Sequence, residues 1–326
     1  MAAEIGIDMG STSTSVYVKG KGVVLKEPSV IAFDRDSKEL RAVGEEAQQI
    51  FERAAGTVIA VYPLKNGVIS NYTLTEKLIS HFIQKALGKP LLKKPRLCIC
   101  VPSRATEIER MAVAGAAEAI GVREVQLVEA PIAAALGAGL DISKPYGTMI
   151  VDIGGGSADI AVISLSSIVT SISLKTAGDD FDDAIVRYMR DAHDLLIGHR
   201  TAEDIKIKIG TAYPFVEEAF MEVWGRNLTD GLLRHIMVSS TEIEKALQES
   251  VYQIVGAIFS VMEQTTAELC ADILERGIIL TGGGALLNGL EELIEEKTGV
   301  TTVTAEDAAK AVVLGTGRFV EVIRFL

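Results

Sequence analysis

The amino-acid sequence predicts an α/β fold built from two pseudo-equivalent halves. Segments with strand and helix patterns alternate along the chain, as they do where helices cover sheets. In addition, one pattern occurs twice, as IGIDMGSTSTSVYV from Ile5 and as MIVDIGGGSADIAVI from Met149. Each copy reads as an apolar strand, one aspartate, a turn rich in glycine or hydroxyl residues, and a second apolar strand. This repetition predicts that each half carries one copy of the same hairpin.

The first half continues with alternating strands and helices. Residues 20–33 are strand-like, with Pro28 at an edge or turn. Thr106 is the expected N-cap of one helix and Gly121 its stop, while Pro131 belongs in the first turn of another helix. In chain order, the later segments are a helix over 74–87, a buried strand over 96–103, a helix over 106–121, a strand over 122–130 and a small-residue helix over 131–140.

The second half restarts the same plan at Met149. Ser240 or Thr241 is the expected cap of a long helix, with Glu244 placed for a capping box. In chain order, the segments are strands over 149–174, an amphipathic helix over 179–196, a mixed polar segment over 201–240 that reads as an inserted subdomain, a long helix over 240–269, and a strand, glycine turn and helix over 277–299.

Composition excludes several classes of function. The net charge of −12 and the pI near 5.0 oppose general nucleic-acid binding, which needs a basic face. Cys98, Cys100 and Cys270 form no metal-binding or redox motif, so we interpret them as small residues in a reducing compartment. The N-terminus leaves no room for a signal peptide, and no stretch reaches the roughly 18 apolar residues of a membrane span. We therefore expect a cytoplasmic protein that binds no nucleic acid.

Three predicted strands end in turns of small residues, DMGSTST, DIGGGSAD and LTGGGALL. Such turns let backbone N–H groups approach phosphate oxygens without a Cβ in the way. The third turn also leads toward a predicted helix N-terminus, where the helix dipole favours an anion. Because Asp8 and Asp152 each precede one copy of the repeated hairpin, we predict a cleft that clamps a polyphosphate with a hydrated Mg²⁺.

A purely structural reading of these turns is the alternative. A single glycine-rich turn after a strand is usually only a tight turn, and Asp8 alone could cap it. An acid in both copies, together with the third glycine turn, favours ligand binding. The chain contains neither a G-x-x-x-x-G-K-[ST] motif nor a strand followed by G-x-G-x-x-G and a downstream acid. Neither a P-loop enzyme nor a dinucleotide-binding fold is therefore supported.

The motifs together resemble the MreB group of bacterial actins. Besides the two hairpins, the segments PLKNGVISNY, VPSRATEIERMAV, TAEDIKIKIGTAYP and ERGIILTGGGALLNGLEELI occur in the family's order over essentially the whole chain. The resemblance implies an actin-like fold with two lobes around a cleft that holds ATP or ADP and Mg²⁺. It implies lobe I over residues 1–145, with a subdomain at roughly 33–70, and lobe II over 146–326. Lobe II would contain a subdomain at roughly 179–242, an adenosine turn at 281–286 and a C-terminal segment that returns to lobe I.

The resemblance also assigns site residues. Asp8 and Asp152 would face Mg²⁺, mainly through water. From the residues alone, Glu203 and Lys206 read more simply as an exposed helical ion pair, and only the resemblance assigns them to the nucleoside. The nucleotide-binding residues that it implies are Ser11, Thr12, Ser13, Gly154, Gly155, Gly156, Ser157, Gly178, Asp179, Glu203, Asp204, Ile205, Lys206, Gly282, Gly283, Gly284 and Ala285.

The chain departs from the family where the attacking water is positioned. The family usually has Glu directly before the proline that opens the AAA helix, and this chain has Ala130. Glu129 is a catalytic candidate only if the strand end shifts by one residue, since strand neighbours point to opposite faces. Ser157 replaces the usual Thr and keeps a hydroxyl, which makes it the second catalytic candidate, and Ser13 replaces the usual Asn. We expect an ATPase that binds ATP and hydrolyses it slowly.

The family further implies filaments of this chain on the inner face of the cytoplasmic membrane, with membrane proteins of cell shape and cell-wall synthesis as partners. The segment GKPLLKKPR lies where the family's membrane-inserting loop lies, with Leu91 and Leu92 as its inserting residues. A buried loop with solvated lysines is the alternative reading. Because a filament repeats the contact many times, membrane binding is expected to depend on polymerisation.

Other functions remain open on the sequence. A sugar kinase or a chaperone ATPase of the same superfamily would share the three turns. A kinase needs a substrate pocket with a catalytic base, for which the inserted segments look too small, and a chaperone needs a substrate-binding domain, which we do not expect here. A regulatory nucleotide-binding subunit that neither polymerises nor hydrolyses ATP is a different class. Sedimentation with ATP and Mg²⁺ separates these possibilities.

Overall fold

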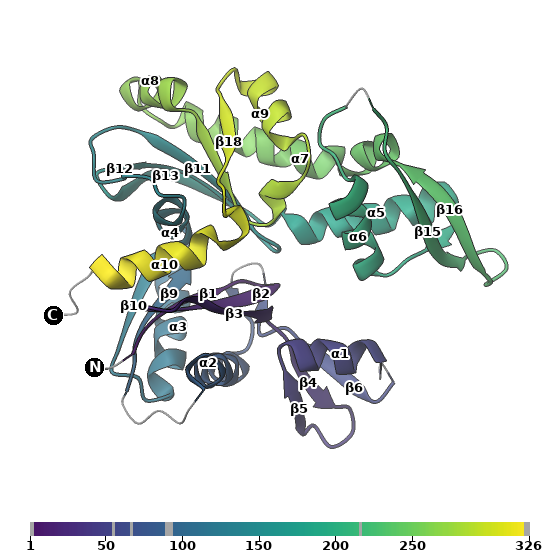
Figure 1. Cartoon of the computed structure of the whole chain (residues 1–326), viewed down its shortest axis with the longest axis horizontal. Coiled ribbons are helices and arrows are strands. Elements are labelled where there is room, and N and C mark those ends of the chain that lie inside the picture. Colours follow the sequence, from purple (N-terminus) through teal and green to yellow (C-terminus); the bar gives the residue numbers. More distant parts are fainter. Residues whose placement is uncertain (1–2, 54–55, 66–67, 89–93, 215–216, 323–326) are drawn as a thin grey trace.

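The computed structural model describes residues 3–53, 56–65, 68–88, 94–214 and 217–322, and its two central sheets repeat one topology (Figure 1). The strand order is β10-β9-β1-β2-β3 in the first sheet and β18-β17-β11-β12-β13 in the second. In each sheet the first three strands are parallel and the last three form an antiparallel meander. The duplication predicted from the two hairpins is therefore confirmed in the fold.

The central strand of each sheet carries its aspartate one residue before its end. Asp8 lies opposite Ser15 across β1–β2, and Asp152 lies opposite Asp159 across β11–β12. The first sheet consists of β1 (Glu4–Met9), β2 (Ser13–Val18), β3 (Gly22–Pro28), β9 (Arg96–Val101) and β10 (Glu124–Glu129). The second consists of β11 (Thr148–Ile153), β12 (Ala158–Ser164), β13 (Ser167–Leu174), β17 (Ile278–Thr281) and β18 (Thr302–Thr304).

Each sheet packs against its own helices, and two further helices lie between the sheets (Figure 1). The helices of the first sheet are α2 (Tyr72–Leu87) and α3 (Glu107–Ala119), and those of the second are α5 (Gly178–His193), α7 (Ser240–Glu263), α8 (Ala267–Arg276) and α9 (Leu290–Thr298). Between the sheets, α4 (Ala130–Gly137) and α10 (Ala311–Val322) share a core with strands of both. Gly137 and Gly315 permit the close approach of these two helices, because a Cβ at either position would overlap the backbone of the other helix.

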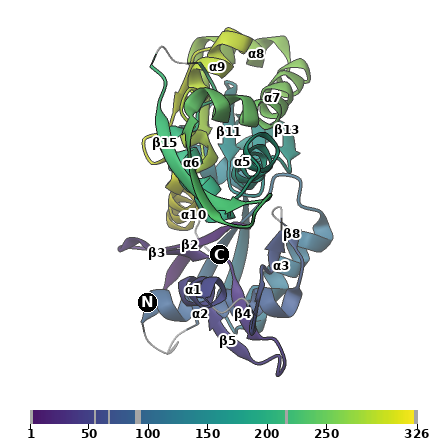
Figure 2. The ribbon, with the colours of Figure 1, turned by 90° about the vertical axis from the view of Figure 1, so that its right-hand side faces the viewer.

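Two small three-stranded sheets project from the same side of the molecule, the side that faces the viewer in Figure 2. The first contains β4 (Ile31–Asp34), β5 (Leu40–Val43) and β6 (Val58–Val61) and carries α1 (Glu45–Arg53). The second contains β14 (Leu195–Leu196), β15 (Phe220–Asn227) and β16 (Leu233–Ser239), next to α6 (His199–Ile209). The remaining elements are β7 (Leu64–Lys65), β8 (Val68–Ile69) and the 3₁₀ turns η1 (Gly284–Leu286) and η2 (Ala308–Lys310).

The sequence placed the start of α3 correctly. Thr106 is its N-cap, and its hydroxyl accepts a hydrogen bond from the backbone N–H of Glu109. The Glu109 carboxylate in turn accepts from the Thr106 backbone N–H at 2.6 Å, which completes a capping box. This helix start is fixed by residues close in sequence, and for that reason the sequence predicts it.

The predicted cap of α7 was wrong by one or two residues. Ser239, rather than Ser240 or Thr241, is the N-cap, and Glu242 rather than Glu244 completes the capping box. The Glu242 carboxylate also contacts the last turn of α5. The sequence offers the capping-box spacing twice, as Ser239-x-x-Glu242 and as Thr241-x-x-Glu244, and this tertiary contact favours the first.

The single long helix predicted over 240–269 was also wrong. The chain forms two helices, because α7 ends at Glu263 and α8 begins at Ala267 with Thr266 as its N-cap. Thr265, in the connection, donates a hydrogen bond to the carbonyl of Val261 at 2.7 Å. Hydroxyl side chains that bond to the backbone in this way favour caps and turns over helix interiors.

The third glycine turn does not lead directly into an α-helix. It passes into the single 3₁₀ turn η1, and α9 begins only at Leu290, after Gly289. The expected helix dipole behind these glycines is therefore missing, and only their backbone is available to a ligand.

Candidate functional site

A cleft of about 570 Å³ opens between the two lobes, and both repeated hairpins line it. The predicted residues that line the cleft are Asp8, Ser11, Thr12, Ser13, Asp152, Gly154, Gly155, Gly156, Ser157, Gly178, Asp179, Glu203, Lys206, Gly282, Gly283 and Gly284. Ile205 and Ala285 are instead buried in the core of the second lobe, and Asp204 is exposed outside the cleft. The structure thus brings together most residues of the expected site from five separate parts of the chain.

The two hairpin turns have the same backbone geometry. The N–H of Gly10 donates to the carbonyl of Ser13 at 3.0 Å, and the N–H of Gly154 donates to the carbonyl of Ser157 at 2.9 Å. In the first turn, the buried Ser29 donates through its hydroxyl to the carbonyl of Gly10 at 2.7 Å. The repeated sequence therefore folds into two equivalent turns that face each other across the cleft.

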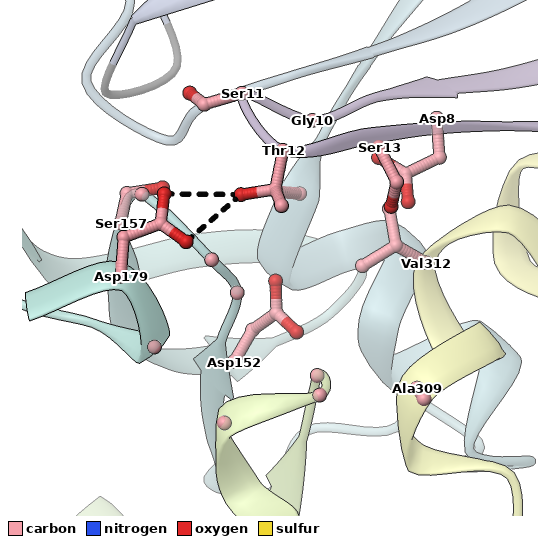
Figure 3. A pocket seen from close by; sticks show the side chains of 18 of the residues that line it. Asp8, Gly10, Ser11, Thr12, Ser13, Asp152, Ser157, Asp179, Ala309 and Val312 are labelled. Carbon is pink, nitrogen blue, oxygen red and sulfur yellow. Dashed lines mark hydrogen bonds between the residues drawn. The ribbon is translucent and has the colours of Figure 1, made fainter. Parts of the chain in front are cut away.

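One side-chain contact joins these two sides of the cleft (Figure 3). The Thr12 hydroxyl donates to the carboxylate of Asp179, with its oxygen 3.2 and 3.1 Å from the two carboxyl oxygens. Thr12 also lies against Gly155, where a Cβ would overlap the threonine side chain. Glycine at position 155 therefore permits the close approach of the two hairpins.

Asp8 and Asp152 point into the cleft from opposite sides (Figure 3). Burial raises the pKa of Asp8 to about 6, and Lys26 opposes this rise. Burial likewise raises the pKa of Asp152 to about 7, and the nearby carboxylates of Asp159 and Asp8 add to that rise. The hydroxyl of Thr281, which donates to Asp152 at 3.0 Å, acts in the opposite direction. A cation between these carboxylates would stabilise their ionised forms.

The available carboxylates fit a hydrated Mg²⁺ that binds together with phosphates. Among the described residues, no group of three or more His, Cys, Asp or Glu side chains is arranged to hold a metal ion. Mg²⁺ keeps several waters and takes few protein carboxylates, whereas structural zinc sites need a closed set of ligands. Asp8 and Asp152 are the residues that would hold such an ion.

Lys206 lies beside the cleft in an ion pair with Asp182. Its ammonium is 2.8 Å from that carboxylate, and it also donates to the carbonyl of Gly178 at 3.0 Å. Burial raises the pKa of Asp182 to about 6, although the lysine opposes the rise. Lys206 is thus paired with α5 rather than with Glu203 on its own helix, and Glu203 lines the cleft separately.

Glu129 does not line the cleft. Its carboxylate accepts a hydrogen bond from the Arg110 guanidinium at 2.6 Å, and it is not among the residues that line the cleft. Ala130 lines the cleft in its place, together with Ser157. The residue that immediately precedes Pro131 therefore presents a methyl group, and no polar atom of its side chain, to the cleft.

Sequence reasoning missed several apolar residues and three charged residues of the cleft, Lys26, Asp159 and Asp182. Leu286, Leu287, Ala309 and Val312 line the cleft, and Figure 3 shows Ala309 and Val312 on the C-terminal segment. The two leucines directly follow the third glycine turn and were within reach of local pattern. Ala309 and Val312 were not, because η2 and α10 reach the cleft only through the tertiary fold.

Two of the missed charged residues, Lys26 and Asp159, come from strands of the two central sheets. They lie on matched cross-strand rows, Asp8–Ser15–Lys26 in the first sheet and Asp152–Asp159–Ser173 in the second. Asp159 lies on the strand that follows the second hairpin turn, and alternate residues of a strand point to the same face. Its position in the sequence was therefore a usable signal that it faces the cleft.

A model of the MreB/Mbl protein family matches residues 2–326. The chain belongs to the MreB/Mbl family. It is 50% identical over 316 residues to the cell shape-determining protein Mbl of Bacillus subtilis, covering 97% of this chain and 95% of that protein. It is 46% identical over 325 residues to the cell shape-determining protein MreB of Escherichia coli, covering 98% and 94%.

Solved structures of the MreB/Mbl type have the same fold. The crystal structure of Spiroplasma citri MreB5 bound to ADP has a TM-score of 0.93 and 35% identity, over 98% of this chain and 96% of that one. A second crystal structure of the same protein is bound to AMPPNP, with the same TM-score. A MamK double helical filament, at 22% identity and a TM-score of 0.84, shares the fold. The actin-like fold implied by the sequence is thus confirmed.

The MreB/Mbl membrane loop cannot be placed in this chain. Leu91 and Leu92, which the resemblance assigned to that loop, lie outside the described residues. Across the described ranges, none of the helices combines the length and the apolar character that crossing a bilayer requires.

Proposed function

We propose that this chain binds ATP or ADP with Mg²⁺ in the cleft and polymerises into filaments. The observation that carries the proposal is the pair of equivalent turns that face each other, joined by Thr12 and Asp179. Their backbone N–H groups suit phosphate oxygens, and the apolar side chains that also line the cleft suit a base. The ADP and AMPPNP held by Spiroplasma citri MreB5 support the same ligand class here.

Mg²⁺ belongs to this proposal as the partner of the phosphates. When bound, it neutralises charge on the phosphate oxygens. The role of this chain is to supply Asp8, which is half-buried, and Asp152, which is buried, at matched ends of β1 and β11, both with raised pKa values. Two carboxylates, rather than a closed set of protein ligands, match an ion that keeps most of its waters.

Hydrolysis of ATP is part of the proposal and is expected to be slow. Phosphoryl transfer to water depends mainly on positioning and electrostatics, and a positioned acid or base contributes roughly 10²–10⁴-fold. Ala130 offers no such group, and Glu129 is held outside the cleft by Arg110. Ser157 retains a hydroxyl beside the phosphate turn and supports a residual rate.

The cellular part of the proposal rests on family membership. We infer peripheral attachment to the inner face of the cytoplasmic membrane, partnership with membrane proteins of cell shape and cell-wall synthesis, and a role in controlling cell shape. The names of the relatives from Bacillus subtilis and Escherichia coli support the last of these. The attachment would use Leu91 and Leu92 and would be strengthened by the repetition of subunits in a filament.

Sedimentation tests the proposal. Purified protein is centrifuged over a range of concentrations with Mg²⁺–ATP, with ATP and a chelator, and without nucleotide. We expect a pellet above a threshold concentration with Mg²⁺–ATP only. Gly155→Val should abolish pelleting, because its side chain overlaps Thr12 and separates the hairpins. Gly198→Val is the matched control, since a Cβ there meets nothing within 4 Å, and it should pellet normally.

A second candidate function is favoured by Ala130. A nucleotide-binding subunit that neither polymerises nor hydrolyses ATP would also lack the water-positioning carboxylate. It would bind ATP and stay in the supernatant at every concentration. That result would contradict the proposed filament formation and favour a regulatory role, while the proposed nucleotide binding would stand.

A further inference from the structure

Asp159 is a buried carboxylate of the cleft for which the proposed nucleotide site gives no role. It lines the cleft, and only 3% of its surface is exposed. In the β11–β12 ladder it stands directly opposite Asp152. Residues directly opposite in a ladder point to the same face, with Cβ atoms about 4.5–5.5 Å apart. Asp159 therefore faces the region where Asp152 would meet Mg²⁺ and the phosphates.

Hydrogen bonds from two serines hold the Asp159 carboxylate. The hydroxyl of Ser103, from the connection between β9 and α3, donates to it at 2.7 Å. The side chain of Ser173, its neighbour on β13, also bonds to it. The backbone N–H of Ser103 also donates to it, at 3.4 Å. An ionised carboxylate has about four acceptor positions, so these three bonds leave capacity for a water molecule. The side chain is thus oriented and still able to accept another hydrogen bond.

The cleft needs such a group, because position 130 provides none. Ala130 and Asp159 line the same cleft, and Glu129 is bound to Arg110 outside it. We propose that Asp159 positions the attacking water for ATP hydrolysis in place of a carboxylate at position 130. This inference rests on the proposed ATP site and adds a catalytic residue to it.

In the proposed step, the water oxygen forms a bond to the γ-phosphorus while the bond from that phosphorus to the β–γ bridging oxygen breaks. The electron pair of the broken bond leaves on ADP. One proton of the water stays on the inorganic phosphate and the other is released to solvent. Asp159 accepts a hydrogen bond from the water and so directs its lone pair at the phosphorus.

A structural role is the alternative for Asp159, since its bond to Ser103 joins the two lobes. Asp159→Asn keeps an acceptor oxygen for the serines and removes the carboxylate. Ser103→Ala is the matched control, because it removes the shorter, hydroxyl bond between the lobes, leaves the backbone bond at 3.4 Å and keeps the carboxylate. Ala130→Glu supplies a background in which a second carboxylate faces the water.

The experiment measures phosphate release in a single turnover with Mg²⁺–ATP, with ATP affinity and sedimentation measured in parallel. We expect Asp159→Asn to slow release by about 10²-fold at unchanged ATP affinity, and Ser103→Ala to slow it less. In the Ala130→Glu background, Asp159→Asn should slow phosphate release by a much smaller factor than it does alone, because the two carboxylates would position the same water.

Three results would overturn the inference while the nucleotide site stands. The first is that Asp159→Asn binds ATP and releases phosphate at the wild-type rate. The second is that Asp159→Asn slows phosphate release by the same factor with Ala130 and with Glu at that position. The third is that the wild-type protein binds ATP and releases no phosphate above a protein-free control. Failure of the proposed function itself looks different, because the wild-type protein would then show no ATP affinity.

Discussion

The Thr12 hydroxyl and the Asp179 carboxylate join the two lobes across the cleft, with oxygen–oxygen distances of 3.2 and 3.1 Å. Thr12 belongs to the first hairpin turn, and Asp179 lies in the first turn of α5. Burial raises the pKa of Asp179, and the hydrogen bond from Thr12 opposes the rise. This contact holds the first hairpin turn against α5, and phosphates in the cleft would compete for the same threonine.

Thr12→Val should therefore destabilise the nucleotide-free protein. The substitution removes the hydroxyl and leaves the Asp179 carboxylate with one fewer donor, which costs about 1 kcal/mol. We expect the midpoint of thermal unfolding without nucleotide to fall by about 2 °C. Thr12→Ser is the control, because it keeps the hydroxyl. Equal midpoints for the two variants would show that the contact contributes nothing.

Asp152 should make the nucleotide-free protein less stable as pH rises. Its pKa is about 7 in the folded chain, against an ordinary value of 3.8. Between these values the folded state binds more protons than the unfolded state, so the free energy of unfolding falls with increasing pH. The loss is complete above the folded pKa and absent below the unfolded one.

Asp152→Asn removes this loss and keeps an acceptor for Thr281. Relative to wild type, the variant should gain up to about 2 kcal/mol of unfolding free energy between about pH 5 and about pH 8. Denaturant titrations at the two pH values, without nucleotide or Mg²⁺, measure the difference. Parallel pH profiles for the two proteins would contradict the assignment of a raised pKa to Asp152.

The sequence predicted those parts of the site that local pattern determines. Asp8 and Asp152 were found because each ends an apolar strand before a turn of small residues. Asp159 was missed although strand alternation after the second turn pointed to it, whereas Val312 could not be found because α10 reaches the cleft only through the tertiary fold. The cap of α7 was misplaced because two capping-box spacings overlap, and the contact of Glu242 with α5 favours the one with Ser239. Contacts between residues far apart in sequence decide those parts of the site that the local sequence pattern does not determine.

Ala130→Glu should accelerate ATP hydrolysis. Position 130 lines the cleft beside the phosphate turns, and an added carboxylate there would orient water, an effect of roughly 10²-fold or more. Phosphate release under polymerising conditions compares the variant with wild type, and Ala130→Gln serves as a control of similar shape without charge. If the glutamate gives no acceleration, position 130 is not where the water is positioned.

Replacing Leu91 and Leu92 together with serine should abolish binding to liposomes that contain anionic lipid and leave polymerisation intact. Burying the two leucines contributes roughly 3–6 kcal/mol per subunit, which a filament multiplies. Co-sedimentation with liposomes measures the loss. The matched control replaces Leu232 and Leu233 with serine, an adjacent and highly exposed pair elsewhere on the surface. Full retention of the Leu91→Ser, Leu92→Ser variant on liposomes would refute membrane insertion by this segment.

The central claim is that the repeated hairpins and their two aspartates form one site for Mg²⁺ and ATP. Calorimetric titration of ATP, with Mg²⁺ and with a chelator, tests it most directly on wild type, Asp152→Ala and the control Asp204→Ala, whose side chain is exposed outside the cleft. We predict Mg²⁺-dependent binding by wild type and Asp204→Ala, and its loss in Asp152→Ala. Unchanged Mg²⁺-dependent affinity in Asp152→Ala would contradict the claim.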